Sequence, residues 1–419
     1  MNRILYLFFL IVLLAACKDE GADENCAPWD IAWQSRAFPG DAYLWLSGED
    51  GEWQASLKLT PQLNEALATE QCDGPVHLSY LEIRPEVVKD GGNTRTETVY
   101  ELTTWLDVPT GFSRDTAARA PVREWPVAIG NVSSLQSLIW PEDNLQAFSG
   151  NIFLDPAAEL LSFAIQVPDT LPAYAFLQAN GEALPRYFWV GKAQDSAFVL
   201  DYEALPQLMY EAPVQLPNTA NWFYEIYGEG ENGQALIDFA SMPDLVSGSF
   251  APRVPVAGIS GFRLKARQVG DYQGWPYAPN AYDRSGSRIP ESVPALPSAP
   301  GMARNGDTLQ VGLFNGSFEA LTAYEVQLVD FRGEGPWLRW TIIGSVEGMA
   351  RLVLPQWPEA LSAARAQLLA PGRQTIALIG AKAYESQPAY QALLEAWMQG
   401  DEDWESRQGL TQRTAAQDF

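Results

Sequence analysis

Histidine is almost missing from this sequence, because the 419 residues include only one, His77. Mechanisms built on an imidazole base and zinc sites built on several histidines therefore have little to use. Cysteine is scarce as well, with three residues and no Cys-x-x-Cys pair, which excludes the usual zinc sites. Lysine and arginine number 27 against 52 acidic residues, for a formal charge of −25. That balance argues against a nucleic-acid partner, which needs a basic surface.

Familiar catalytic motifs are absent too. The chain has no Gly-x-Ser-x-Gly, His-Glu-x-x-His or Gly-x-x-x-x-Gly-Lys-Ser/Thr pattern, and no Gly-x-Gly-x-x-Gly between a strand and a helix. Acidic loops such as 229–232 lack the regular spacing of a calcium loop. We therefore expect no cofactor and no metal. A pair of carboxylates, as in glycoside hydrolases, is the one catalytic device left open, because the many acidic residues offer countless pairs.

The first residues have the layout of an export signal. Met1-Asn2-Arg3 is positively charged, and the apolar run Ile4–Ala16 has 13 residues, too few to span a bilayer as a helix. The run ends in Leu14-Ala15-Ala16-Cys17, which resembles the lipobox of bacterial lipoproteins. The resemblance stops at Cys17 and implies that residues 1–16 are a signal peptide and that Cys17 carries acyl chains. The alternative is an ordinary signal peptide that happens to contain a cysteine.

Acylation at Cys17 would tie the chain to a membrane. Each buried CH₂ group of an acyl chain contributes about 0.8 kcal/mol, so several chains make a stable anchor. Lys18 stands where an Asp would favour retention in the inner membrane, and Lys18-Asp19-Glu20 is similar to tethers of surface-exported lipoproteins. We expect residues 17–27 to be an acidic tether of an outer-membrane lipoprotein, with cell-surface exposure favoured over a periplasmic location. A plain solvated spacer explains the same residues without export.

Two cysteines remain once Cys17 is acylated. A Cys26–Cys72 disulfide would close a loop of about 46 residues and contribute about 3–4 kcal/mol in an oxidising compartment. It would fix the tether to the first domain. Two separate buried thiols are the alternative.

The rest of the chain has the sequence pattern of antiparallel β-structure. Tyr43–Leu46 and Trp53–Leu59 flank a turn at 48–51, and the second run alternates apolar and polar residues. Asn-Gly pairs mark further turns, and aromatic and β-branched runs lie between them. The sequence therefore predicts a mainly β protein with two or three antiparallel, immunoglobulin-like β-sandwich domains and a few short helices. The helices are expected at 358–369 and 388–399.

Composition divides the chain into segments. Five prolines in 277–302 favour extended chain that cannot enter a sheet interior, so this stretch is interpreted as a linker. The predicted segments are the signal peptide (1–16), the acidic tether (17–27), a β-rich domain (28–135), a β-sandwich domain (136–276), the Pro-rich linker (277–302), an immunoglobulin-like sandwich (303–384), and a helix with a flexible tail (385–419).

Aromatic residues offer the best binding candidates. Exposed Trp and Tyr side chains stack on sugars and anchor protein interfaces. Tyr272, Trp275 and Tyr277 lie among Gly and Pro residues that disfavour a packed strand, so we select them as a binding platform. Burial in a core is the competing interpretation. For His77, alternation with Val76 and Leu78 predicts a solvent-facing strand position.

These observations favour a non-enzymatic, lipid-anchored envelope protein that binds a protein or a glycan through its β-domains. A carbohydrate-active hydrolase or lyase that uses acidic residues is the alternative, and enzymatic activity is left open. A structural component that holds a partner near the membrane is a third hypothesis. The membrane, reached through the acyl chains, is the other expected partner.

Overall fold

The protein is mainly β, as the sequence predicts. The computed structural model describes residues 29–34, 40–60, 64–69, 75–90, 93–109, 112–114, 122–134, 137–139, 153–168, 173–190, 198–217, 221–230, 233–242, 248–255, 257–294, 298–313, 321–330, 336–370, 375–401 and 403–419. The predicted signal peptide and tether lie outside these ranges, as do all three cysteines.

A 12-stranded sheet, here called the central sheet, contains most of the long strands. In spatial order its members are β18 (Gly233–Met242), β17 (Trp222–Gly230), β21 (Gly261–Gln268), β24 (Asn280–Gly286), β31 (Leu410–Asp418), β30 (Thr375–Tyr384), β27 (Leu321–Asp330), β28 (Trp337–Ser345), β6 (Asn93–Val108), β5 (Val76–Asp90), β2 (Asp41–Gly48) and β3 (Trp53–Leu59). The β2–β3 hairpin matches the one predicted from the sequence.

Three blocks of four strands, each from one part of the chain, make up the central sheet. The middle block (222–286) ends at β24, which pairs antiparallel with β31 of the C-terminal block (321–418). On the other side of that block, β28 pairs parallel with β6 of the N-terminal block (41–108). The C-terminal block therefore joins the other two.

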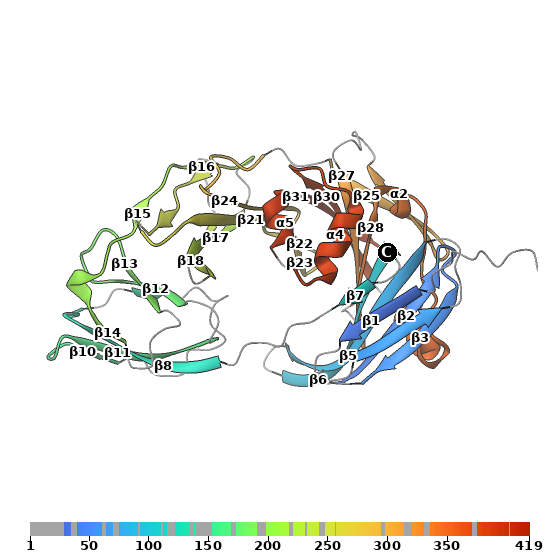
Figure 1. The fold of residues 1–419 in the computed structure, drawn as a ribbon, viewed down its shortest axis with the longest axis horizontal. Coiled ribbons are helices and arrows are strands. Elements are labelled where there is room, and N and C mark those ends of the chain that lie inside the picture. The colour runs from blue at the N-terminus through green and yellow to red at the C-terminus, as the bar shows by residue number, and fades with distance from the viewer. Residues whose placement is uncertain are drawn as a thin grey trace, which may run out of the picture.

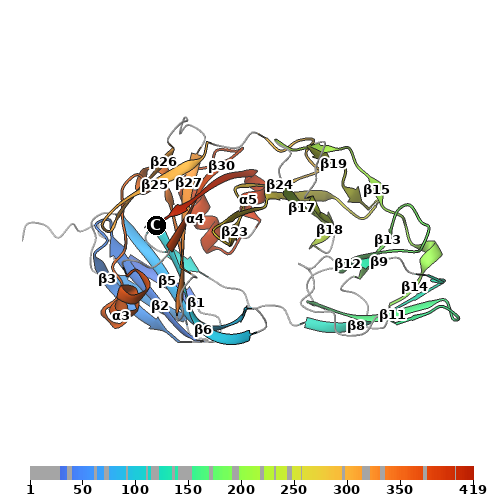
Figure 2. The same cartoon turned by 180° about the vertical axis from the view of Figure 1, so that it is seen from behind.

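The remaining strands form smaller sheets. They are β1 (Trp29–Gln34), β4 (Asn64–Thr69) and β7 (Phe112–Arg114); β8 (Val122–Gly130), β10 (Phe153–Asp155), β11 (Leu160–Pro168) and β14 (Phe198–Asp201); β9 (Ser137–Ile139), β12 (Ala173–Gln178) and β13 (Arg186–Val190); β25 (Pro300–Asn305), β26 (Thr308–Leu313) and β29 (Leu352–Val353); and the pairs β15 (Met209–Tyr210) with β20 (Arg253–Val254), β16 (Val214–Gln215) with β19 (Ser249–Phe250), and β22 (Gly270–Tyr272) with β23 (Trp275–Tyr277). Figures 1 and 2 place β8, β11 and β14 at the opposite end of the elongated molecule from β2 and β3.

Helices in the described residues are short. They are α2 (Val346–Met349), α3 (Ser362–Leu368), α4 (Tyr390–Met398), α5 (Trp404–Gln408) and the 3₁₀ turns η2 (Tyr202–Ala204) and η3 (Glu359–Leu361). The helices predicted at 358–369 and 388–399 are confirmed as η3 with α3 and as α4.

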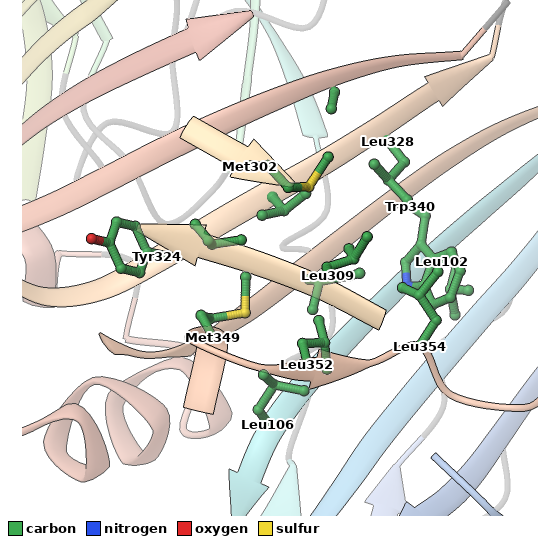
Figure 3. Close-up of a cluster of buried hydrophobic side chains, with 14 of the residues drawn as sticks. Leu102, Leu106, Met302, Leu309, Tyr324, Leu328, Trp340, Met349, Leu352 and Leu354 are labelled. Atoms are coloured by element: carbon green, nitrogen blue, oxygen red, sulfur yellow. The ribbon is translucent and has the colours of Figure 1, made fainter. Parts of the chain in front are cut away.

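One face of the central sheet is covered by the small sheet β25–β26–β29. Met302, Leu309 and Leu352 of the small sheet share an apolar cluster with side chains of the central sheet, among them Trp340 (Figure 3). Trp340 is fully buried, and its indole Nε1 donates to Thr104 Oγ1 at 3.0 Å, across the parallel β28–β6 junction. Burying side chains of this size contributes about 1.5–3 kcal/mol each, so this cluster holds the N-terminal and C-terminal blocks together.

The other face is covered by α4 near the N-terminal block. Leu393 and Leu394 of α4 are fully buried in a second cluster with Leu44 and Leu78. The Tyr390 hydroxyl lies 3.0 Å from the carbonyl oxygens of both Leu106 and Ile343, so it fastens the start of α4 to β6 and β28. Farther along the same face, toward β31, α5 packs beside β24 and β30, with Ser406 Oγ 2.9 Å from Ser285 Oγ and Glu405 3.0 Å from Lys382.

Two segments differ from the sequence-based expectation. The Pro-rich stretch 277–302 contains β24, which lies inside the central sheet, because its prolines flank the strand rather than interrupt it. The residues after Gly400, expected to be a flexible tail, form α5 and β31. Backbone hydrogen bonds to β24 on one side and β30 on the other order this polar strand, and composition alone does not reveal them.

Candidate functional site

Tyr272, Trp275 and Tyr277 all lie on one β-hairpin, β22–β23. Tyr272 pairs with Trp275, and Gly270 pairs with Tyr277. The two turn residues, Gln273 and Gly274, have φ angles of 53° and 86°. Two consecutive positive φ angles match a tight hairpin turn whose twist suits the flanking strands. The three aromatic side chains are half-buried, so the structure places them between the core and full exposure.

The hairpin crosses over the central sheet. Near its tip, Gln273 Nε2 donates to Asp418 Oδ1 at 2.6 Å, and the Tyr272 hydroxyl donates to the same oxygen at 3.4 Å. The Arg339 guanidinium of β28 lies 5.8 Å from the centre of the Trp275 ring, within reach of a cation–π contact. The hairpin is therefore held at β31 and extends toward β28.

A small cavity of about 150 Å³ lies beside the hairpin. Tyr277 lines it from the hairpin side, with Pro276 and Ala278. Strands of the central sheet supply the other lining residues, which are Glu325, Gln327, Leu378, Gly380, Gln412 and Thr414. Carboxylate, amide and hydroxyl groups thus surround one aromatic side chain.

Charged residues continue across the same sheet from the Trp275 contact. Arg339 Nη1 lies 3.4 Å from Glu101 Oε1, and Arg84 Nη2 lies 2.9 Å from Glu101 Oε2. Their side chains are 28% to 36% exposed. The hairpin surface is defined here as Trp275 and Tyr277 with the cavity residues and this charged row of Arg339, Glu101 and Arg84. The sequence alone identified only the aromatic part, because Arg339 and Glu101 are 238 residues apart and meet through the β28–β6 pairing.

A buried ion cluster supports one wall of the cavity. Lys382 Nζ lies 2.9 Å from Glu325 Oε2 and 3.0 Å from Glu405 Oε1 of α5, and the Tyr384 hydroxyl donates to Glu405 at 2.7 Å. Burial opposes the charge on Lys382, but the two carboxylates outweigh it and raise its pKa well above the ordinary value. The cluster ties α5 and β27 to β30.

A second, larger cavity of about 600 Å³ lies where β2, β5 and β6 end. His77 lines it but is only 4% exposed, so the predicted solvent-facing position is wrong. Both faces of β5 are covered at this point, since Val76 and Leu78 are buried as well. His77 Nδ1 accepts a hydrogen bond from the Asp107 backbone N–H at 3.3 Å. Burial lowers the pKa of His77 to about 4, although Asp50 opposes the shift.

Asp107 is the carboxylate set deepest in that cavity's wall. Burial raises its pKa, a hydrogen bond from the Ser345 hydroxyl lowers it, and the charge of Glu49 raises it again. The backbone φ of Asp107 is 55°, a left-handed conformation that Asp and Asn tolerate better than most residues. Glu49, Asp50 and Glu347 line the same cavity from exposed positions.

Within the described ranges, no group of three or more His, Cys, Asp or Glu residues is arranged to hold a metal ion. No helix in these ranges is both long and apolar enough to cross a bilayer. The acylation site Cys17 and the predicted Cys26–Cys72 disulfide lie outside them, so both stay predictions.

The chain was compared with protein-family models and with curated proteins. No protein-family model matches the chain, and no curated protein matches it significantly.

Proposed function

We propose that this protein is a non-enzymatic, lipid-anchored component of the bacterial outer membrane that binds a glycan through the hairpin surface. The observation that carries the proposal is the position of Tyr277, which lines a cavity together with Gln327, Gln412 and Thr414. Sugar rings present an apolar face that stacks on an aromatic ring and hydroxyl groups that pair with amides, carboxylates and hydroxyls. The hairpin surface combines both kinds of group.

The size of the cavity suggests how a glycan would lie. Its volume of about 150 Å³ suits one sugar unit or a side branch rather than a long chain. The rest of the glycan would follow the half-exposed row of Arg339, Glu101 and Arg84, whose guanidinium and carboxylate groups bond to hydroxyls. This arrangement favours a glycan over a protein partner, because protein interfaces are centred on larger apolar patches.

The hydrolase alternative has less support. Two carboxylates near the hairpin, Glu101 and Glu325, are each engaged by cationic side chains, Arg84 and Arg339 for the first and Lys382 for the second. We therefore assign them to recognition and structure rather than to proton transfer. The expectation of two or three immunoglobulin-like sandwiches stays part of the proposal, and the packing of β25–β26–β29 on the central sheet supports a sandwich in the C-terminal part.

Replacing Tyr277 with Ala should weaken glycan binding about tenfold, equivalent to about 1.4 kcal/mol. The protein, solubilised in detergent, would be screened on a glycan array and the strongest ligand titrated by calorimetry. Trp275→Ala should weaken binding as well, whereas Tyr210→Ala, an exposed tyrosine on β15, should leave it unchanged. Unchanged glycan affinity in the triple variant Tyr272→Ala/Trp275→Ala/Tyr277→Ala would show that this surface is not the binding site. Capture of a protein partner without binding of any glycan would show that the ligand is a protein.

The lipid anchor predicts that cells fed an alkyne-tagged palmitate label this protein and that Cys17→Ser abolishes the label. Cys26→Ser and Cys72→Ser are the matched controls and should keep it. Protease added to intact cells should release fragments of the body while a periplasmic marker stays intact. Label retained by Cys17→Ser would contradict the anchor, and full protection until the outer membrane is permeabilised would place the body in the periplasm.

A further inference from the structure

The cavity at the ends of β2, β5 and β6 lies apart from the hairpin surface. It is called the end pocket here and is lined by Gly48, Glu49, Asp50, Gln54, Pro75, His77, Asp107, Glu347, Gly348, Arg351, Leu352 and Val353. Its volume of about 600 Å³ is within the range of small-ligand sites. Nothing in the proposed function uses it.

The end pocket has an excess of negative charge. Four carboxylates, those of Glu49, Asp50, Asp107 and Glu347, line it with a single guanidinium, that of Arg351. In the described part of the chain, none of the four forms a salt bridge. Like charges brought together around one cavity repel one another, so a cationic group placed among them is attracted.

A buried polar side chain gives a second, independent indication of a ligand. His77 is 4% exposed, and its Nδ1 accepts from the Asp107 N–H, so the neutral ring carries its proton on Nε2. Nε2 has no hydrogen-bond partner among the described residues, and the ring lines the pocket. Nε2 is not among the enclosed atoms that lack a partner, so this N–H is open to the pocket and favours a ligand with a neutral acceptor such as a carbonyl oxygen.

We propose that the end pocket binds a lysine or arginine residue of a peptide. The ammonium or guanidinium group would pair with Asp107 and the neighbouring carboxylates, and a backbone carbonyl of the same segment would accept from His77 Nε2. A free amino acid fits less well, because its own carboxylate would face four others. An amino sugar offers a cation and hydroxyl acceptors too, so the test includes one.

The test is calorimetric titration of the purified protein with Nα-acetyl-lysine amide and Nα-acetyl-arginine amide. We expect binding of both, weakened by added salt, and no binding of Nα-acetyl-norleucine amide, which lacks the charge. Asp107→Asn should weaken binding at least about tenfold, because Asn keeps the left-handed backbone and the shape but removes the charge. The exposed Glu203→Gln, on η2, is the matched control and should change nothing.

Two further variants separate charge from geometry. A Cβ added at Gly348 would lie 2.7 Å from Asp107 Oδ2, so Gly348→Ala should displace that carboxylate and weaken binding with the charge kept. His77→Asn keeps an acceptor near the Nδ1 position and removes the Nε2 donor, so we expect a loss of about fivefold. Melting curves for each variant exclude unfolding as the cause.

The proposal is overturned if the norleucine amide binds as tightly as the lysine amide, or if none of the cationic probes binds at millimolar concentration. Full affinity in Asp107→Asn overturns it as well. Binding of glucosamine without either peptide probe would overturn the peptide assignment. Because the hairpin surface is a separate site, loss of glycan binding in Tyr277→Ala with lysine-amide binding intact would support the end-pocket proposal independently of the proposed glycan site.

Discussion

Lys382→Met should lower the free energy of unfolding by about 3–5 kcal/mol, because it leaves buried carboxylates without their counter-charge. Lys382 is 4% exposed and is shared by Glu325 and Glu405, whose side chains are only 26% and 22% exposed. Met keeps most of the side-chain volume, so a cavity does not explain the loss. The measurement is urea unfolding of the purified protein, followed by tryptophan fluorescence.

Two variants show whether charge is the cause. The double variant Lys382→Met/Glu405→Gln removes one of the stranded charges and should recover part of the lost stability. Lys58→Met breaks an ion pair with Asp41 whose side chains are both more than half exposed, and its unfolding midpoint should stay unchanged. Equal effects at Lys382 and Lys58 would mean that the buried cluster is not a special contributor to stability.

His77 should make the protein less stable as the pH falls from about 6.5 to 4. Burial lowers its pKa from 6.5 to about 4 in the folded protein. Between these values the unfolded chain binds a proton that the folded chain does not, so the free energy of unfolding rises with pH across this window. The free energy of unfolding lost to His77 protonation is about 3 kcal/mol in total. None of it is lost above the unfolded-state pKa, and all of it is lost below the folded-state pKa.

The check compares the pH dependence of unfolding in wild type and His77→Asn. The two proteins differ in no other ionisable side chain, so subtracting the curves isolates the histidine. Asn also accepts the Asp107 amide hydrogen near the position of Nδ1. Parallel curves between pH 4 and 6.5 would show that His77 is protonated as readily in the folded state as in the unfolded one.

Local patterns predicted local structure well. The β2–β3 hairpin and helix α4 follow from alternation, turn residues and helical spacing, which act over a few neighbouring residues. The Pro-rich stretch shows the limit of such reasoning. Within this stretch Pro279 precedes β24 and Pro290 follows it, so the prolines themselves stay out of the strand, but their preference does not extend to the residues between them.

The candidate sites could be predicted only in part. Tyr272, Trp275 and Tyr277 are close in sequence, and a tight turn brings them together. Arg339 meets Glu101 only because β28 pairs with β6 in one particular register, which no local signal specifies. The prediction that His77 faces solvent is wrong because the alternation rule assumes that one face of the strand is exposed to solvent. At His77, both faces of β5 are covered.

The position of β31 sets an order on folding. Among the described strands, Leu410–Asp418 alone pairs with both β24 and β30, so the sheet of the middle block cannot continue into that of the C-terminal block until these residues are available. The β28–β6 junction likewise brings together residues more than two hundred positions apart. A chain with such long-range strand pairings folds slowly, and its strand edges stay unpaired and exposed until the pairing is complete. Under the proposed lipid-anchored location the chain crosses a membrane before it folds, and late pairing of these strands would keep it in a transportable, unfolded state until then.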